Sequence, residues 1–377
     1  MSKEKYKRIV VKVGTSSITD EKGAPSSEKL LHLAEECVKV IRSGKELILV
    51  SSGAIASGKE ILLKLAKRKD LPAKQALSAV GQVRLMQYYS QVFSIFKQPI
   101  AQILLTAEDL YDRRRYLNIS QTFETLLDEK VIPIINENDT VAVEEIKIGD
   151  NDTLSAKVAC AVNADLLIIL SDVEGLYSSD PYKSPEAKLI EEVYKITEDI
   201  ERLAGSGKGT GGMHTKISAA HIVTEAGIPM ILAKADTDNV LERIVLKGEK
   251  IGTIFYSVQK PQNRKKHWIL FMSKPEGKIT IDKGAKEAIL LKGKSLLPVG
   301  IKKVEGEFYK GDTILICDED GNEIGRGISN YDSIDLLKII GKISEEIKGI
   351  IGEDSYEEVI HRNNLVINKE ILTIDYS

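Results

Sequence analysis

Short apolar runs alternate with longer amphipathic stretches from residue 7 to about residue 255. The runs are five or six residues long and rich in β-branched residues; they lie at 8–13, 46–50, 100–105, 131–135, 165–170 and 228–233. Helical patterns between them cover 27–43, 73–96, 115–129 and 153–162. Continuous apolar strands separated by helices are typical of strands buried on both faces. We therefore expect an α/β/α sandwich with a mainly parallel central sheet.

Two segments depart from this pattern. Residues 140–149, "TVAVEEIKIG", alternate between apolar and polar positions, which predicts a hairpin. Residues 256–268 are polar and basic, and beyond them short strands, frequent glycines and the turn "DEDGNE" predict a small β-rich domain. The expected division is a first domain over 1–257, a linker over 258–275, the small domain over 276–358 and a tail over 359–377.

The composition fits two folded domains. Of 377 residues, 42% are hydrophobic and 29% are charged, which provides enough apolar material for sizeable cores. A formal net charge of −3 argues against a protein whose main task is to bind nucleic acid phosphates. Three scattered cysteines argue against a disulfide framework and a zinc cluster. Because no apolar run has the length of a membrane span, we expect a cytoplasmic protein without a membrane partner.

Charge is unevenly distributed in the C-terminal part. Residues 264–310 carry 12 basic and 5 acidic side chains, a net charge of +7, whereas residues 311–377 carry 6 and 15, a net charge of −9. The basic segment is suited to an anion or RNA. The alternative interpretation is that the two segments neutralise each other on a solvated surface.

Polar and glycine-rich segments follow the apolar runs, where parallel strands end and α/β proteins bind ligands. They are 12–17 ("KVGTSS"), 51–58 ("SSGAIASG"), 136–141 ("NENDTV"), 149–156 ("GDNDTLSA"), 171–181 ("SDVEGLYSSDP") and 209–216 ("GTGGMHTK"). Glycines that open a helix leave backbone N–H groups available to an anion, and Lys12 and Lys216 add positive charge. These segments predict a phosphate-binding site in which Asp152 holds both lysines.

The residue set favours phosphoryl transfer, which depends on positioning and charge neutralisation. No general base is evident. A carboxylate acceptor does not need one, because a Glu side chain with an ordinary pKa of about 4.3 is already ionised at pH 7. The pattern "GKGTGG" at 207–212 is weak evidence for dinucleotide binding, because it follows a polar helical stretch instead of a strand. No P-loop, protein-kinase or G-x-S-x-G motif occurs.

Five motifs follow one another along the first domain: "VVKVGTSSIT", "VSSGAIASG", "INENDTVAVEEIKIGDNDTLSA", "LSDVEGLYSSDP" and "GTGGMHTK". In this order they resemble the amino acid kinase family, and within it the ATP-dependent kinases that phosphorylate the γ-carboxylate of L-glutamate at the start of proline biosynthesis. The segments "GKITIDKGAKEAILLKGKSLLPVGI" and "FYKGDTILI" resemble a PUA domain. The resemblance covers nearly the whole chain and implies the amino acid kinase fold followed by a PUA-like domain.

The resemblance also implies roles for individual residues. Lys12, Lys216 and Asp152 match the catalytic set: a phosphate-contacting lysine, a lysine that stabilises charge during transfer, and the aspartate that organises both. The implied substrate-binding residues are Ser52, Gly53, Ala54, Asp139 and Asn151. The implied nucleotide-binding residues are Lys12, Gly14, Ser171, Asp172, Thr210, Gly211, Gly212, Met213, His214, Thr215 and Lys216. No residue is assigned to a metal.

Several residues near these motifs have a second interpretation. Asp150 is either a site residue or the N-cap of the following helix. Asn136 and Glu137 are expected to be turn residues that support Asp139. We expect His214 to point outward. We expect the three arginines at 113–115 to lie on a solvated helix surface or in a subunit contact.

The resemblance implies ATP and Mg²⁺, the latter held by phosphates and water more than by the protein. It further implies L-glutamate as substrate, proline as feedback inhibitor, and a homo-oligomer, either a dimer or a tetramer. Two alternatives remain at this point. One is a related carboxylate kinase acting on N-acetylglutamate or aspartate, and the other is an RNA-binding regulatory protein that acts through its PUA-like domain.

Overall fold

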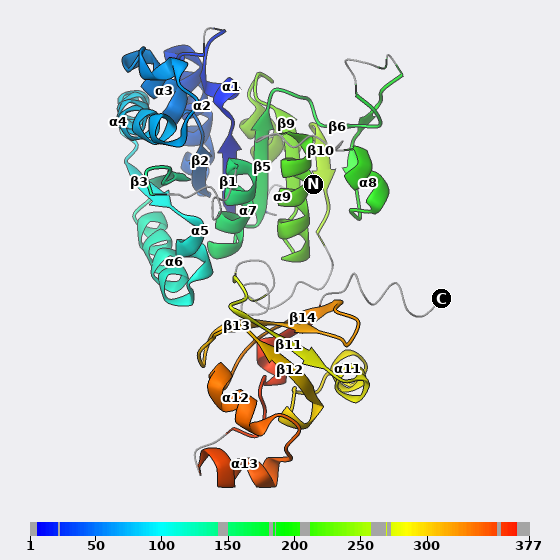
Figure 1. Cartoon of the computed structure of the whole chain (residues 1–377). Helices are drawn as coiled ribbons and strands as arrows, with labels where there is room; N and C mark the ends of the chain where they lie inside the picture. Colours follow the sequence, from blue (N-terminus) through cyan, green and yellow to red (C-terminus); the bar gives the residue numbers. More distant parts are fainter. Residues whose placement is uncertain are drawn as a thin grey trace. The chain divides into compact units, whose positions relative to one another are not determined.

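The computed structural model describes residues 6–21, 23–141, 150–180, 184, 186–203, 212–257, 269, 273–352 and 356–367. The chain divides into two compact units, Met1–Pro261 and Gln262–Ser377, each built around its own sheet (Figure 1). Most of the hairpin predicted at 140–149 and most of the linker predicted at 258–275 lie outside the described residues, so both remain predictions.

The first unit contains an eight-stranded sheet in the order β3-β4-β2-β1-β5-β9-β10-β8. Its strands are β1 (Arg8–Val13), β2 (Glu46–Ser51), β3 (Ile100–Leu105), β4 (Ile132–Glu137), β5 (Leu166–Ser171), β8 (Glu192–Val193), β9 (Met230–Lys234) and β10 (Thr253–Phe255). Neighbouring strands are parallel except β9 and β10. All six predicted strands are present, which confirms the mainly parallel sheet. A separate hairpin pairs β6 (Leu176–Tyr177) with β7 (Leu189–Ile190).

Helices cover both faces of this sheet, as expected for the sandwich (Figure 1). They are α1 (Thr15–Ile18), α2 (Ser27–Arg42), α3 (Ala54–Ile61), α4 (Leu71–Ile95), α5 (Ala107–Tyr111), α6 (Arg113–Asp128), α7 (Asn151–Ala161), α8 (Glu198–Leu203) and α9 (Met213–Glu225), with a π-helical turn at Glu242–Lys247.

The two faces of β1 have different neighbours. Ile9 and Val11 join a buried core with apolar residues of α2 and α4, including Leu33 and Leu85. Because side chains alternate along a strand, Lys12 points to the opposite face. There α7 packs against β1 and lies beside α9. The end of β1 therefore directs Lys12 toward the N-termini of α7 and α9.

The second unit is a five-stranded mixed sheet in the order β12-β11-β13-β14-β15. Its strands are β11 (Gly277–Ile281), β12 (Ile301–Glu305), β13 (Thr313–Cys317), β14 (Glu323–Ile328) and β15 (Leu365–Ile367), and its helices are α11 (Lys283–Leu290), α12 (Ser333–Ile339) and α13 (Ser344–Ile351). Short helical turns lie at Pro298–Gly300 and Arg362–Asn364.

The small domain extends past residue 358, beyond which we expected only a tail. Val359 and Ile360 are fully buried in its core. β15 pairs antiparallel with β14, with Leu365 opposite Gly327. The expected boundary at 358 is therefore too early: a three-residue strand gives no periodic signal in the sequence, and only its pairing with β14 defines it.

Candidate functional site

The ends of β1, β2, β4 and β5 border a cleft of about 490 Å³, the strand-end cleft. Its lining includes these residues singled out from the sequence: Lys12, Gly14, Ser52, Gly53, Ala54, Asp139, Asn151, Asp152, Ser171, Asp172 and Lys216. Of the described residues from Gly212 to Lys216, which form the N-cap and first turn of α9, only Lys216 lines the cleft, while His214 is exposed, as expected. Thr210 and Gly211 lie outside the described residues.

Asp152 joins two lysines in the floor of the strand-end cleft. Its Oδ1 lies 2.6 Å from Lys12 Nζ and its Oδ2 lies 3.2 Å from Lys216 Nζ. Thr215 Oγ1 donates a further hydrogen bond to Oδ2 at 2.7 Å. Asp152 is fully buried and the lysines are 7% and 5% exposed, so solvent screens these ion pairs weakly. The carboxylate of Asp152 thus fixes two ammonium groups at one point of the cleft.

The two lysines keep Asp152 ionised. Burial by itself raises the pKa of this carboxyl, but attraction to Lys12 and Lys216, together with the hydrogen bond from Thr215, outweighs burial and leaves the pKa below its ordinary value. An ionised Asp152 accepts a hydrogen bond from Lys216 and forms an ion pair with Lys12, so its charge orients both ammonium groups. Its place in the first turn of α7 is also favourable for a negative charge.

A chain of amide hydrogen bonds orients Ser52 on the other side of the cleft. Asn151 Nδ2 lies 2.8 Å from Ser52 Oγ and 3.0 Å from Asn136 Oδ1. Asn136 Nδ2 in turn donates to Gln82 Oε1 at 2.9 Å. Asn136 and Gln82 are buried, so each amide has few alternative partners. Asn136 and Glu137 are the last two residues of β4, so the expectation of turn residues is wrong, and Asn136 links α4 to Asn151.

Asp139 is also held by α4. Ser78 Oγ donates to Asp139 Oδ2 at 2.9 Å. Lys74, one turn before Ser78, lines the strand-end cleft. The sequence analysis missed Lys74, Ser78 and Gln82. Their spacing of four residues, which places them on one helix face, is the signal that could have identified them.

Glycines precede two helices at the site, Gly53 in the cleft lining and Gly212 before the helix that carries Lys216. Gly53 has φ +107°, a conformation that strongly favours glycine, and it precedes the first turn of α3. Gly212 precedes α9, which begins without a side-chain cap, so backbone N–H groups at this helix start are available to an anion. On the opposite wall, Ser171 Oγ donates to Asp172 Oδ1 at 3.0 Å.

Asp150 has the capping role that was left open. Its Oδ1 accepts from the backbone N–H of Thr153 at 2.8 Å, and its Oδ2 accepts from the Thr153 hydroxyl at 3.1 Å. Burial raises the pKa of Asp150, and repulsion from Asp152 adds to this shift. Asp150 also lines the cleft, so its capping bonds fix the start of α7 at the site.

Comparison with known proteins identifies the family of this chain. The sequence model of the amino acid kinase family matches residues 7–234, and that of the PUA domain matches residues 277–351. A protein named glutamate 5-kinase from Dictyoglomus thermophilum is 76% identical over 362 residues, which cover 96% of this chain and 98% of the relative. The chain belongs to the amino acid kinase family.

Two further proteins are similar to this chain. A protein named glutamate 5-kinase from Carboxydothermus hydrogenoformans is 49% identical over 365 residues, covering 96% of this chain and 97% of the relative. A solved UMP kinase from Bacillus anthracis matches 67% of this chain and 96% of its own, with 18% identity and a TM-score of 0.48.

The described part of this amino acid kinase contains no protein cage for a metal ion. No three Asp, Glu, His or Cys side chains among the described residues gather closely enough to hold one. The same part of the chain contains no helix with the length and apolar character that crossing a bilayer requires.

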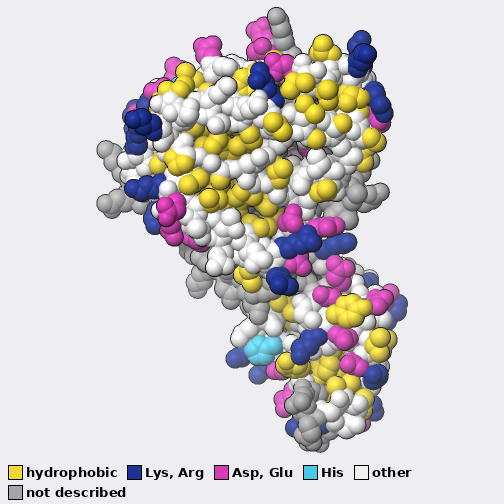
Figure 2. Space-filling view, turned by 90° about the vertical axis from the view of Figure 1, so that its left-hand side faces the viewer, with side chains coloured by type: hydrophobic (Ala, Val, Ile, Leu, Met, Phe, Trp, Pro, Cys, Tyr) yellow, Lys and Arg dark blue, Asp and Glu magenta, His cyan; other side chains and the backbone are white. Residues whose placement is uncertain are grey.

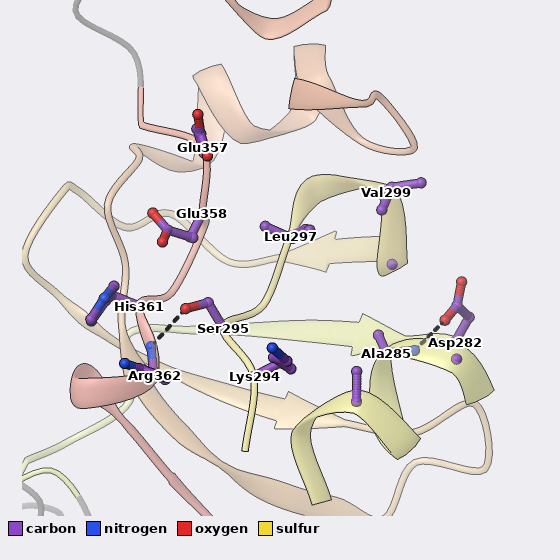
Figure 3. Close-up of a pocket in the computed structure, with 13 residues that line it drawn as sticks. Asp282, Ala285, Lys294, Ser295, Leu297, Val299, Glu357, Glu358, His361 and Arg362 are labelled. Carbon is purple, nitrogen blue, oxygen red and sulfur yellow. Dashed lines mark hydrogen bonds between the residues drawn. The ribbon is translucent and has the colours of Figure 1, made fainter. Parts of the chain in front are cut away.

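The PUA domain contains a larger cavity, of about 700 Å³, which includes none of the predicted site residues (Figure 3). Its charged lining consists of Lys294, His361, Arg362, Asp282, Glu357 and Glu358. A surface for nucleic acid phosphates is mainly basic, whereas this lining is mixed. Lys286 also pairs with Asp318 at 3.1 Å, so the basic and acidic segments neutralise each other at this point. RNA binding remains a prediction.

Proposed function

We propose that this amino acid kinase transfers the γ-phosphoryl group of ATP to the γ-carboxylate of L-glutamate, giving L-glutamyl 5-phosphate and ADP at the start of proline biosynthesis. The observation that carries the proposal is the Lys12–Asp152–Lys216 cluster, which lies beside the amide-bonded Ser52 in one cleft. Relatives named glutamate 5-kinase, at 76% identity over nearly the whole chain, support the choice of substrate.

The acceptor needs no base. A γ-carboxylate oxygen forms the new bond to the γ-phosphorus, while the bond from that phosphorus to the β–γ bridging oxygen breaks and leaves with ADP. Since the carboxylate is ionised at neutral pH, no proton moves in this step. Lys12 and Lys216 stabilise the negative charge on the transferring group, and Asp152 holds both ammonium groups in place before the reaction.

We assign the two halves of the cleft to the two substrates. Asp139 accepts the ammonium group of glutamate, and Ser52, Gly53, Ala54 and Asn151 position its acceptor end. To the nucleotide we assign Gly14, Ser171, Asp172 and Lys216, which line the cleft. The family resemblance adds the segment from Thr210 to Thr215 to the residues proposed to bind the nucleotide. The start of α9 contributes its unpaired N–H groups and the positive end of its dipole to the phosphates.

Magnesium accompanies ATP in this proposal. We expect the ion to be held mainly by phosphate oxygens and water, as Mg²⁺ usually is in kinases. When bound, Mg²⁺ supplies neutralisation of charge between the β- and γ-phosphates.

Hydroxylamine trapping tests the proposed reaction, because an acyl phosphate reacts with hydroxylamine to give a hydroxamate. The protein is incubated with ATP, Mg²⁺ and glutamate, N-acetylglutamate or aspartate in turn. We expect hydroxamate from glutamate, and its loss in Lys216→Ala. Product from N-acetylglutamate alone contradicts the substrate assignment, and no product from any of the three contradicts the kinase assignment.

We also propose, from the family resemblance, proline as feedback inhibitor, a cytoplasmic location and a dimer or tetramer. The face that carries α4, β3 and α6 supports a second copy as partner, since hydrophobic side chains gather over it (Figure 2). Val83 and Ile95 of α4 are 62% and 64% exposed, and Leu117 of α6 is 52% exposed. Apolar patches of this kind mark interaction surfaces in soluble proteins.

A further inference from the structure

One face of α4 presents polar side chains to the strand-end cleft. Lys74, Ser78 and Gln82 are four residues apart and therefore lie along one side of the helix. Gln82 bonds Asn136 and Ser78 bonds Asp139, both on the substrate side of the cleft. Lys74 comes next along this face and lines the cleft itself.

Lys74 differs from the other two lysines that line the cleft. Lys12 and Lys216 both form ion pairs with Asp152. Lys74 forms no ion pair with any described residue, and its side chain is exposed toward solvent. The same lining contains Asp139, whose carboxylate attracts a cationic group. The lining of the cleft thus includes both a carboxylate, Asp139, and a lysine without an ion pair to a described residue, Lys74.

An α-amino acid has a matching pair of charges. Its ammonium and carboxylate are bonded to the same carbon, so the protein groups that bind them must lie close together. Asp139 is held by Ser78, and Ser78 is one helical turn from Lys74, where Cβ atoms are roughly 5–6 Å apart. When the ammonium group of an α-amino acid is bound to Asp139, the side chain of Lys74 can therefore reach the α-carboxylate of the same molecule.

We propose that Lys74 binds the α-carboxylate of the substrate and so determines specificity for a free α-amino acid. This inference rests on the proposed function, in which the γ-carboxylate is the acceptor. Lys74 makes a charge-assisted hydrogen bond to the end of the substrate that does not react. Its contribution is to substrate binding, whereas Lys12 and Lys216 act on the transferring group.

A comparison of two substrates with two variants tests this role. L-Isoglutamine carries a neutral amide in place of the α-carboxylate and keeps the ammonium group and the γ-carboxylate. In Lys74→Met we expect the KM for L-glutamate to rise by about 10- to 100-fold, because a hydrogen bond to a charged group is lost. The KM for L-isoglutamine and the KM for ATP stay within about twofold of wild type. Lys74→Arg keeps the charge and recovers most of the affinity for glutamate.

Lys59→Met is the matched control, since Lys59 is an exposed lysine of α3 outside the cleft lining, and we expect it to behave as wild type. Equal increases in KM for both substrates in Lys74→Met, or no increase for glutamate, overturn the role of Lys74. An unchanged KM for ATP reports that the variant is folded. If wild type itself forms no hydroxamate from glutamate, the proposed function fails. If wild type is active and Lys74→Met has the same KM for glutamate, only the role of Lys74 fails.

Discussion

Lys12 Nζ lies 2.6 Å from Asp152 Oδ1, and this pair joins the end of β1 to the first turn of α7. The sheet fixes the position of Lys12 at the end of β1, and α7 fixes the position of the Asp152 carboxylate. Lys216 approaches the other oxygen from the first turn of α9, which packs along α7. A single buried aspartate therefore sets the separation of two lysines that no shared element connects.

Replacing the aspartate tests this arrangement. In Asp152→Asn we expect kcat for hydroxamate formation to fall by about 10²- to 10³-fold, because the lysines lose the charge that orients them. Two buried ammonium groups lose their counter-ion, so the free energy of unfolding falls by about 3–5 kcal/mol. Asp236→Asn, at a carboxylate that is 63% exposed, is the control and leaves both quantities near wild type. Wild-type turnover in Asp152→Asn contradicts the role of the aspartate.

The same aspartate predicts a dependence of stability on acid pH. Because its pKa is lowered in the folded protein, its stabilisation is complete above the ordinary carboxyl pKa of about 3.9 and is lost as pH falls through the lower native value. The difference in unfolding free energy between wild type and Asp152→Asn is therefore constant at neutral pH and shrinks below about pH 4. Denaturant titrations between pH 7 and pH 3 measure it. A difference that does not shrink in acid argues against an ionised Asp152.

The buried amide chain predicts a selective effect on glutamate. Gln82→Met keeps the side-chain length but removes the acceptor for Asn136 Nδ2, leaving a buried donor unsatisfied at a cost of about 1–3 kcal/mol. We expect the KM for glutamate to rise by about tenfold and the KM for ATP to stay unchanged. Steady-state kinetics with each substrate varied in turn measure the two constants. Gln87→Met, at an exposed position of the same helix, is the control. A parallel rise in both KM values would instead indicate a general loss of structure.

Close packing of α3 on α4 gives a further prediction. A Cβ at Gly81 would lie 1.8 Å from the carbonyl oxygen of Ala54, the first residue of α3. Gly81→Ala therefore forces the helices apart, which we expect to cost about 1–3 kcal/mol of stability and to raise the KM for glutamate. Thermal unfolding and kinetics report the two effects. Gly349→Ala, where a Cβ meets open space, is expected to be neutral or slightly stabilising. Equal behaviour of the two variants is evidence against this helix contact.

The C-terminal strand predicts where the chain tolerates shortening. A chain that ends at residue 358 lacks Val359, Ile360 and β15, and we expect its second unit to lose cooperative unfolding, because a core segment and a sheet edge are missing. A chain that ends at Ile367 keeps all three and serves as the control. Calorimetry of both chains measures the transition. A normal transition in the shorter chain would show that β15 is dispensable.

The sequence by itself determined six strands of the central sheet and the strand ends at which we propose that ligands bind. The run at 8–13 is β1 at Arg8–Val13 and the run at 46–50 is β2 at Glu46–Ser51, because continuous apolar, β-branched segments have few stable alternatives to a buried strand. Gly and charged residues after these runs marked the strand-end cleft, because the carboxyl ends of parallel strands lie at one edge of a sheet.

Only the tertiary structure decided the remaining parts. β8, β10 and β15 are two or three residues long, so their pairing defines them and periodicity does not. Polar residues at 74, 78 and 82 resemble a solvated helix face in the sequence, and the packing of α4 beside the cleft turns that face toward the substrate side. Local pattern specifies how a segment folds, whereas the neighbours of a polar side chain depend on contacts between segments far apart in the chain.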